Sequence, residues 1–235
     1  MRRSFAQVSP AARRADLSLR DKICVVTGAS RGIGLACASA LGTAGARVAV
    51  CASGTVPSVS AELSRRCDVS DSQAVGRFFT EVQAVLGPPD VVVLNAGVLE
   101  RGPLEEFTDE QWDRVLGVNL RGAFLCARAA WSSLARTRGR LIGMGSISGT
   151  LGTAEAAAYN ASKWGLTGLV KSLAEEGREA GIFAALVLPG SVDTDMLRKT
   201  PFEPQMTPED VARVVRFLAE EAPFAMTGSA VEVFG

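Results

Sequence analysis

Short apolar runs alternate along the chain with longer stretches in which apolar residues recur every three or four positions. The short runs are rich in valine, isoleucine and leucine, and they predict strands at residues 23–27, 47–52, 90–97, 139–146, 182–190 and 228–235. Because these runs are mostly apolar throughout, instead of alternating with polar residues, they are typical of parallel strands covered on both faces.

The longer stretches predict helices at residues 32–44, 71–87, 108–135, 155–180 and 207–221. Local signals for helix starts support three of them. Asp71 stands at an N-cap position, and Thr108 precedes Gln111 with the spacing of a capping box. Pro208 occupies the first position of the last helix, where its missing N–H costs nothing.

Strands that alternate with helices predict an α/β fold, here a single doubly wound Rossmann-type domain with an about seven-stranded parallel sheet and helices on both faces. We assign residues 21–235 to this domain and residues 1–20, which are rich in arginine, to a flexible N-terminal extension. Ligands bind such sheets beyond the carboxyl ends of the strands. The turns of interest therefore follow Thr27, Ala52, Leu94, Met144 and Leu188.

Composition narrows the chemistry, because the chain of 235 residues contains no histidine. Ser-His-Asp hydrolysis, Cys-His proteolysis and His-ligated zinc are excluded, so proton transfer must use other side chains or water. The 25 basic and 25 acidic residues balance, which disfavours nucleic acid and anionic membranes as partners. The five cysteines lie in apolar or periodic stretches, so we expect buried reduced thiols, no metal site and a cytoplasmic location.

The turn after the first predicted strand reads TGASRGIG at residues 27–34, with glycines at 28, 32 and 34. Glycine permits a tight turn and lets a phosphate approach the backbone N–H groups at the start of a helix. Strand–helix turns also use glycine for packing alone. Because this loop opens a predicted βαβ unit, we favour dinucleotide binding over packing.

The loop has the pattern Thr-Gly-x-x-x-Gly-x-Gly, and further motifs follow it in order. They are NAG (95–97), Asn119 in VNLRGAF, Ser146 in GSISG, YNASK (159–163) and PGSVDT (189–194). With this set the chain resembles the short-chain dehydrogenase/reductase family over about residues 21–235. The resemblance implies an oxidoreductase that interconverts a ketone and a secondary alcohol by hydride transfer with a nicotinamide cofactor.

Tyr159 is the only tyrosine of the chain, and Lys163 follows it one helical turn later. A nearby cation stabilises a phenolate, so we expect Lys163 to lower the pKa of Tyr159 and make it a general acid/base. Ser146, after the preceding strand, would hold the substrate oxygen against Tyr159. The resemblance implies further that Lys163 binds the nicotinamide ribose and that Asn119 orders a water in a proton relay. Each residue alone also fits an ordinary structural role, but the set favours catalysis.

The end of the second strand distinguishes NAD from NADP in Rossmann-type sites, because an acid there repels a 2′-phosphate. The segment VCASGT (50–55) contains no acid, and Ser53 and Arg31 offer a hydrogen bond and a charge. We therefore expect NADP(H) to be favoured over NAD(H). The segment between Ser53 and Cys67 is short for the family, which predicts a truncated helix or a loop there.

The predicted cofactor contacts combine the glycine loop, the second-strand end and the later family motifs. By resemblance, Asp68 holds the adenine ring, and Val192 and Thr194 contact the nicotinamide amide and the pyrophosphate. The full predicted set is Gly28, Ser30, Arg31, Gly32, Ile33, Gly34, Ser53, Asp68, Val69, Asn95, Ala96, Gly97, Tyr159, Lys163, Pro189, Gly190, Val192 and Thr194.

The substrate walls are expected at residues 99–103, 149–156 and 196–207, and the last of these is too short for a large lid. An open mouth suits a bulky or carrier-bound carbonyl substrate, and PGSVDTDM resembles 3-oxoacyl-(acyl carrier protein) reductases. We rank a 3-oxoacyl thioester first and sugars, polyols or xenobiotic carbonyls next.

An alternative of another class is a dinucleotide-binding sensor without turnover, which the retained Tyr159 and Lys163 disfavour. The resemblance also implies a homo-oligomer, dimer or tetramer, that pairs through the helices at 108–135 and 155–180. A monomer with amphipathic surface helices is the open alternative.

Overall fold

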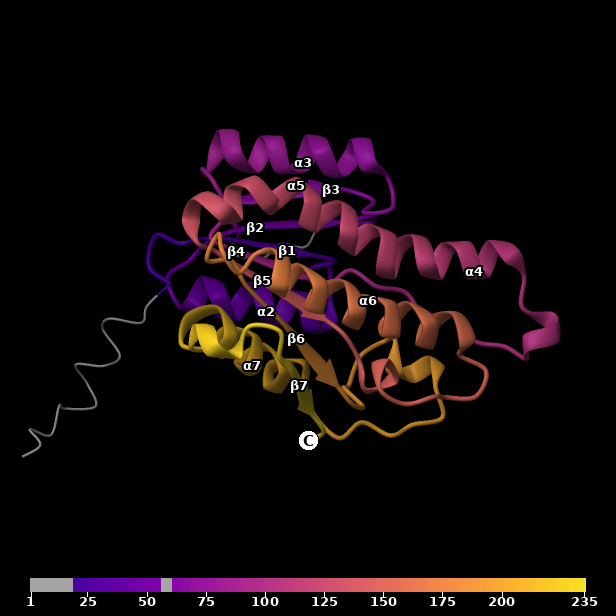
Figure 1. Cartoon of the computed structure of the whole chain (residues 1–235). Coiled ribbons are helices and arrows are strands. Elements are labelled where there is room, and N and C mark those ends of the chain that lie inside the picture. The colour runs from indigo at the N-terminus through magenta and orange to yellow at the C-terminus, as the bar shows by residue number, and fades with distance from the viewer. Residues whose placement is uncertain (1–18, 56–60) are drawn as a thin grey trace, which may run out of the picture.

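The computed structural model describes residues 19–55 and 61–235. Seven parallel strands form one sheet in the order β3-β2-β1-β4-β5-β6-β7 (Figure 1). The strands are β1 (Ile23–Thr27), β2 (Arg47–Ala52), β3 (Leu63–Arg66), β4 (Val91–Leu94), β5 (Arg140–Met144), β6 (Phe183–Pro189) and β7 (Ala230–Val233). The strand order reverses beside β1, between β2 and β4. The predicted α/β, doubly wound parallel sheet is thus confirmed.

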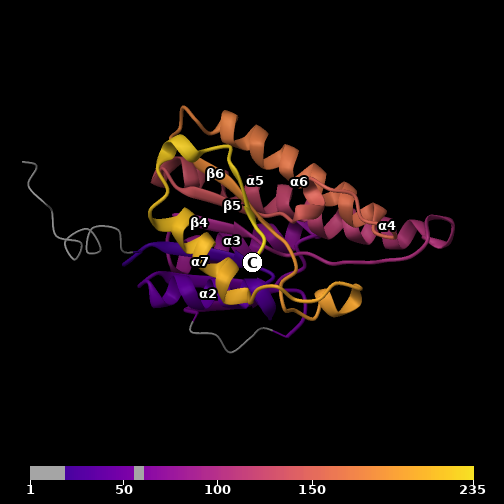
Figure 2. The same cartoon turned by 90° about the horizontal axis from the view of Figure 1, so that it is seen from below.

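Helices cover both faces of the sheet (Figures 1 and 2). One face carries α2 (Gly32–Thr43) and α7 (Pro208–Glu220), which pack side by side, and the other carries α3 (Ser72–Val85), α5 (Gly122–Thr137) and α6 (Ala157–Glu176). Strand residues alternate between the two cores, so Cys24 packs toward α2 and α7 while Val25 packs toward α3 and α5. Both residues are completely buried, which explains why the strands are apolar throughout.

The predicted helix at 108–135 is wrong in its middle. The capping box at its start is present: Thr108 N donates to Gln111 Oε1 at 2.9 Å, and Gln111 N donates to Thr108 Oγ1 at 3.3 Å. After α4 (Asp109–Leu116), however, the chain widens into the π-helical turn η2 (Gly117–Arg121) before α5 begins. Such turns insert a residue into a helix and often lie at functional sites. The site residue Asn119 lies in this one.

Strand β3 has no counterpart among the runs predicted to be strands. Its residues read LSRR, and all but Leu63 are at least partly exposed. An edge strand needs few apolar residues because it has a neighbour on one side only, so its pattern carried no signal. The predicted loop or short helix between Ser53 and Cys67 falls partly on residues 56–60, outside the described residues.

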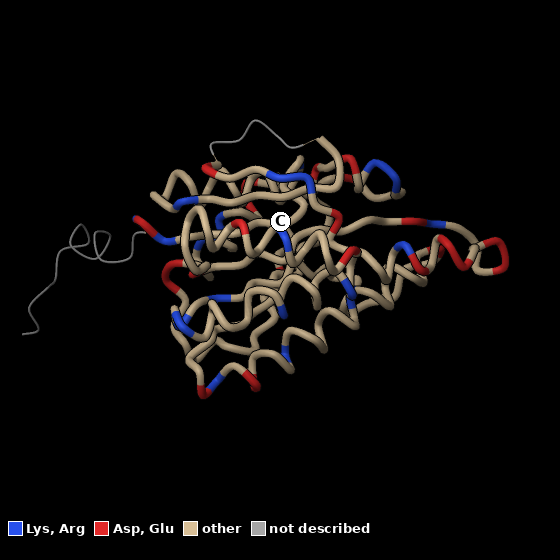
Figure 3. Tube along the Cα trace, turned by 90° about the horizontal axis from the view of Figure 1, so that it is seen from above, with Lys and Arg blue, Asp and Glu red and all other residues tan. Residues whose placement is uncertain are grey.

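The N-terminal extension also falls largely outside the described residues, so its boundary at residue 20 stays a prediction. Leu19 is buried against the core beneath α2 and α7, with 4% of its surface exposed. All five cysteines are free and buried, as the sequence predicts for small apolar residues. Within the described ranges, no helix is both long and apolar enough to cross a membrane. Acidic and basic residues are interspersed along the described trace (Figure 3).

Candidate active site

The carboxyl ends of β1 and β4 are joined by side-chain hydrogen bonds at the point where the strand order reverses. Asn95 Nδ2 donates to the carbonyl oxygens of Thr27 at 2.9 Å and Gly28 at 3.1 Å. Thr27 Oγ1 in turn accepts from the backbone N–H groups of Asn95 at 3.0 Å and Ala96 at 3.2 Å. The NAG turn is therefore fixed against the glycine loop. Thr27, the first letter of the loop motif, is a positioning residue that the sequence reasoning missed.

The glycine loop needs glycine for backbone reasons. Gly28 has a φ of 66°, and a Cβ atom there would lie 2.6 Å from Ala96 Cα. Gly32 also has a positive φ, and a Cβ on Gly34 would collide with the Asn95 side chain. The loop residues Ser30 and Ile33 are partly buried beside them. This close approach of two backbone turns explains the glycines without reference to a ligand.

Replacing Gly28 by alanine is expected to lower the free energy of unfolding by about 2 kcal/mol, because the side chain meets both positive φ and the Ala96 backbone. Equilibrium denaturation in urea measures the change. Gly152→Ala is the matched control, since a Cβ there meets no atom within 4 Å. Equal losses in the two variants would contradict the packing explanation.

The N-terminus of α2 has the features of an anion site. Its N-cap residue, Arg31, makes no side-chain hydrogen bond to the first turn, and that turn contains no acidic residue. The first N–H groups of a helix have no intrahelical partner, and the helix dipole adds partial positive charge. Together with the glycines, the start of α2 therefore fits the pyrophosphate of a dinucleotide.

Ser146, Tyr159 and Lys163 come together where β5 ends and α6 begins. Lys163 Nζ donates to the carbonyl oxygen of Met144, the last residue of β5, at 2.8 Å and lies 5.5 Å from the Tyr159 ring centroid. Ser146 lies two residues beyond the end of β5, and its side chain acts to lower the pKa of Tyr159. Ser146 Oγ also accepts from Ser148 N at 3.1 Å, which holds the serine in place. The three predicted residues therefore share one site.

The pKa of Tyr159 moves in the direction opposite to our prediction. Burial raises it above the ordinary value of 10.0, and the hydrogen bond with Ser146 offsets only part of this rise. Burial also lowers the pKa of Lys163 to about 8. The expected lowering by Lys163 is not seen, because its ammonium is directed to the Met144 carbonyl and desolvation dominates for both groups.

Asn119 uses its whole side-chain amide within the protein. Oδ1 accepts from Val98 N at 2.8 Å, and Nδ2 donates to Val98 O and to Ser162 Oγ, both at 3.0 Å. Ser162 Oγ donates onward to the carbonyl oxygen of Tyr159 at 2.7 Å. The π-helical turn thus ties the loop after β4 to α6. A Cβ on Gly97 would lie 3.4 Å from Asn119 Oδ1 and 3.8 Å from Lys163 Nζ, so Gly97 lies beside both groups.

The predicted residues for the adenosine end lie around the ends of β2 and β3. The carbonyl of Cys51 accepts from Ala29 N at 3.1 Å, which links the glycine loop to β2. Arg31 Nε lies 3.5 Å from Asp195 Oδ2, and Ser53 is exposed. The Ser53 carbonyl accepts from Arg66 Nε at 2.9 Å.

Asp68 and Val69 begin the loop that leads into α3. Asp68 Oδ1 accepts from Ser70 N at 2.9 Å and from Ser70 Oγ at 2.7 Å, so this carboxylate also shapes a turn. Val69 is buried and packs closely against Gly122 at the start of α5. Adenine contact by these two residues stays a prediction.

The turn after β6 lies over the glycine loop. Pro189 ends β6, Gly190 N donates to Val233 O at 2.9 Å, and Val192 forms a parallel bridge with Met206. A Cβ on Gly32 would lie 3.2 Å from Thr194 Cγ2, which brings Thr194 next to the start of α2.

Two of the three expected substrate walls touch each other. Gly102 N donates to Glu155 O at 3.0 Å, and an Nη atom of Arg101 donates to Ala154 O at 3.1 Å. Asn160, the residue after the tyrosine, also anchors this loop, because its Nδ2 donates to Thr153 O at 3.0 Å. No sequence pattern indicated that role separately.

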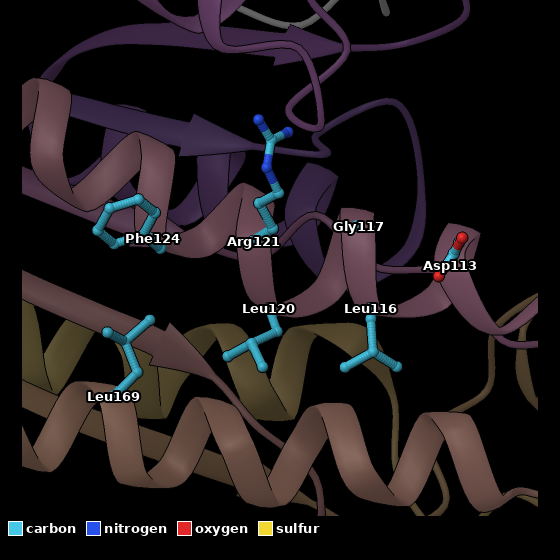
Figure 4. Close-up of a pocket in the computed structure, with 7 residues that line it drawn as sticks. All are labelled: Asp113, Leu116, Gly117, Leu120, Arg121, Phe124 and Leu169. Atoms are coloured by element: carbon cyan, nitrogen blue, oxygen red, sulfur yellow. The ribbon is translucent and has the colours of Figure 1, made fainter.

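A groove lies on the outer surface between the α4–α5 helix and α6 (Figure 4). Leu116, Leu120 and Leu169 project between the two helices, while Arg121 projects away from them. The lining residues are Asp113, Leu116, Gly117, Leu120, Arg121, Phe124 and Leu169. None of them belongs to the Ser146, Tyr159 and Lys163 set, so this apolar groove is separate from the candidate active site.

A doubly wound sheet with a glycine loop at its reversal point, beside a serine, a tyrosine and a lysine, is the architecture of a dinucleotide-dependent oxidoreductase. Residues 22–204 match the family model described as short chain dehydrogenase, and the chain belongs to this family. The family resemblance, the oxidoreductase class and the binding of a nicotinamide dinucleotide are thereby confirmed.

Curated relatives cover nearly the whole chain. The 3-oxoacyl-[acyl-carrier-protein] reductase MabA of Mycobacterium bovis is 40% identical over 224 residues, which are 90% of this chain and 90% of the relative. The acetoacetyl-CoA reductase of Rhizobium meliloti is 36% identical and covers 91% of this chain and 97% of its own length. The (3R)-3-hydroxyacyl-CoA dehydrogenase of Mus musculus is 38% identical, with coverages of 94% and 98%.

Solved structures agree with this assignment. The crystal structure of gox2181 superposes with a TM-score of 0.87 at 32% identity and covers 93% of this chain and 96% of its own. The aldohexose dehydrogenase of Thermoplasma acidophilum gives a TM-score of 0.86 at 28% identity, with coverages of 92% and 93%.

Proposed function

We propose that the chain is an NADP(H)-dependent reductase of 3-oxoacyl thioesters, with Tyr159 as its general acid/base. The observation that carries the proposal is the cluster at the end of β5, where Lys163 Nζ bonds the Met144 carbonyl and lies 5.5 Å from the Tyr159 ring, with the Ser146 side chain acting on the same tyrosine. In a chain without histidine, this phenol is the acid best placed to protonate a carbonyl oxygen.

The nicotinamide, when bound, supplies the hydride that the carbonyl carbon accepts. Ser146 and Tyr159 donate hydrogen bonds to the carbonyl oxygen and orient it. Because its pKa lies above 10.0, Tyr159 is protonated at neutral pH, which is the form that gives its proton to the developing alkoxide. Lys163, fixed by the Met144 carbonyl, adds positive charge where the phenolate forms. Asn119 positions α6 through Ser162, and its water relay is part of the proposal.

The start of α2 would hold the pyrophosphate on its free N–H groups. Gly28, Gly32 and Gly34 belong to the proposed cofactor site because they allow the tight turn that leads into α2. The NADP(H) preference rests on the absence of an acid at residues 50–55 and on Arg31 at the start of α2. Asp68, Val69, Asn95, Ala96, Pro189, Gly190, Val192 and Thr194 complete the proposed cofactor site.

The thioester substrate is supported by the three kinds of relative named above, all of which act on 3-oxoacyl or 3-hydroxyacyl compounds. Two apolar side chains near the expected walls are exposed, Leu151 at 56% and Phe202 at 49%, and they offer contacts for an acyl chain. A sugar substrate is the second candidate, because the aldohexose dehydrogenase has nearly the same fold.

A panel of substrates tests the proposal. Acetoacetyl-CoA and longer 3-oxoacyl thioesters are assayed for reduction with NADPH or NADH, and aldohexoses are assayed for oxidation with NADP+ or NAD+. We expect the highest kcat/KM with a 3-oxoacyl thioester and NADPH. A higher kcat/KM with an aldohexose would show that a sugar, and not a thioester, is the substrate class. Binding of NADPH without turnover of any compound would favour a sensor.

Replacing Arg31 by alanine is expected to raise the Kd of NADPH about tenfold relative to that of NADH, because one charge-assisted contact to the 2′-phosphate is lost. Fluorescence titration of both cofactors measures the ratio. Arg213→Ala is the control, because this exposed arginine pairs with Asp210 on α7. An unchanged ratio in Arg31→Ala would remove Arg31 from the cofactor site.

We also propose that the chain forms a homodimer or homotetramer in the cytoplasm. Support for association comes from the apolar groove that the segment from α4 to α5 forms with α6. Further support comes from exposed aromatic side chains on α4, α5 and α6, namely Trp112, Phe124 and Trp164. Support for a reducing compartment comes from the five free, buried thiols. Light scattering of the purified protein would decide the oligomeric state.

A further inference from the structure

We propose that Arg66, at the end of β3, is a specificity-determining residue that binds the 2′-phosphate of NADP(H). This inference rests on the NADP(H) preference proposed above and adds a contact from a strand that the sequence pattern did not reveal. The 2′-phosphate site is thereby built from two segments, the glycine loop with Arg31 and the end of β3 with Arg66.

The sheet register places Arg66 at the adenosine end of the site. Arg66 pairs with Ala52, the last residue of β2, and its Nε donates to the carbonyl of the next residue, Ser53, at 2.9 Å. The end of β2 is where Rossmann-type sites read the ribose 2′ position. The guanidinium of Arg66 thus lies beside the end of β2, where an acidic side chain would disfavour NADP.

The charge of Arg66 is not neutralised by the part of the chain that the structure describes. No described carboxylate lies within 4.0 Å of it, and its hydrogen bond to Ser53 O uses only Nε. The loop at residues 56–60 reads VPSVS and contains no acid. The Nη groups are therefore available to a phosphate, which a planar guanidinium binds through paired N–H groups.

The preceding residue, Arg65, provides a contrast. Its Nε donates to both carboxylate oxygens of Glu81 on α3, at 2.9 Å each, and an Nη atom makes a further bond to Glu81. Successive residues of a strand point to opposite faces, so Arg65 is directed to α3 while Arg66 is not. Arg65 thus forms an ion pair that joins β3 to α3, whereas the charge of Arg66 has no described counter-charge at the candidate site.

Arg31 alone is poorly suited to hold a phosphate that carries nearly two negative charges. It already lies 3.5 Å from Asp195, and 76% of its side chain is exposed. Arg66 is restrained by the Ser53 carbonyl, so less rotamer entropy is lost when it binds. A second, pre-positioned cation explains how a β2 end without any basic residue at 50–55 can favour NADP(H).

Fluorescence titration of Arg66→Gln with NADPH and NADH, together with calorimetric titration of 2′,5′-ADP and 5′-AMP, tests the inference. We expect the Kd of NADPH and of 2′,5′-ADP to rise about tenfold, while the values for NADH and 5′-AMP change less than about twofold. Arg65→Gln is the matched control and should alter none of the four Kd values. Arg66→Lys should retain part of the preference, because it keeps the charge without the paired geometry.

If Arg66→Gln keeps the wild-type ratio of NADPH to NADH affinity, Arg66 does not bind the 2′-phosphate. The proposed NADP(H) preference would still stand. Equal effects of Arg65→Gln and Arg66→Gln would also overturn the role of Arg66, since they would indicate only a general change of surface charge. If the wild-type protein binds NADH as tightly as NADPH, the proposed cofactor preference fails and this inference fails with it. Unchanged NADH binding shows that each variant is folded.

Discussion

Tyr159→Phe is expected to lower kcat for reduction of a 3-oxoacyl thioester by about a thousandfold, in line with the loss of a positioned general acid. The ring and its packing stay, and only the hydroxyl is removed. Binding of NADPH should be nearly unchanged, because the hydroxyl acts on the substrate oxygen. Steady-state oxidation of NADPH, with cofactor binding measured separately, gives both quantities.

The single tyrosine of the chain makes a direct control possible. Ultraviolet titration of tyrosinate in the wild-type protein reports the pKa of Tyr159 alone, and we expect a value above 10.0 without cofactor because burial dominates. The phenylalanine variant should show no tyrosinate signal at all. Equal turnover by the two proteins would exclude Tyr159 as the acid and leave the proton to another group or to water.

Much of the fold could be predicted from the sequence, because buried parallel strands carry an unmistakable pattern. The run ICVVT became β1, and Asp71 and Pro208 marked the starts of α3 and α7. These signals are local: a cap or an apolar run depends on neighbouring residues only. Strand β3 was missed for the same reason, since its LSRR sequence is stabilised by pairing with β2 and not by its own apolar content.

The site was predictable as a set of residues but not as a set of interactions. Motif order brought Ser146, Tyr159 and Lys163 together, and the structure places them at one strand end. The π-helical turn at Asn119 depends on how two helix segments meet the loop after β4, which no periodicity encodes. The direction of the Tyr159 pKa was mispredicted because helical spacing gives the distance to Lys163 but not the degree of burial of either group.

Burial of Lys163 sets function against stability. The residue is 4% exposed, and its Nζ donates to the Met144 carbonyl. Among the described residues, no carboxylate forms an ion pair with it. An ammonium without a counter-charge is costly to bury, and active sites often contain such strained groups. Other interactions in the fold compensate for this loss of stability. Removing the charge should therefore raise the free energy of unfolding by the amount that its burial costs.

Lys163→Met is therefore expected to inactivate the enzyme and to make its stability depend on pH differently from the wild type. In the folded chain the pKa of Lys163 is about 8, below the ordinary 10.5 of the unfolded chain. Below pH 8 both states carry the charge, so the folded state bears the full burial penalty. Between pH 8 and 10.5 the unfolded state binds more protons than the folded state, so wild-type stability rises with pH. The shift corresponds to about 3 kcal/mol.

Denaturant unfolding of the cofactor-free proteins at pH 7 and near pH 10 measures this effect as a difference between variant and wild type. The advantage of Lys163→Met should shrink by about 2.5 kcal/mol over that interval, because part of the unfolded chain still carries the charged lysine near pH 10. Lys171→Met is the control, since this exposed lysine of α6 also donates to a backbone carbonyl, that of Gly228 at 3.1 Å. Its difference from wild type should stay constant. A constant difference for Lys163→Met as well would show that Lys163 is not desolvated. Its charge would then act on Tyr159 through solvent. Across solvent, a cation 5.5 Å from the ring has little influence on the phenol.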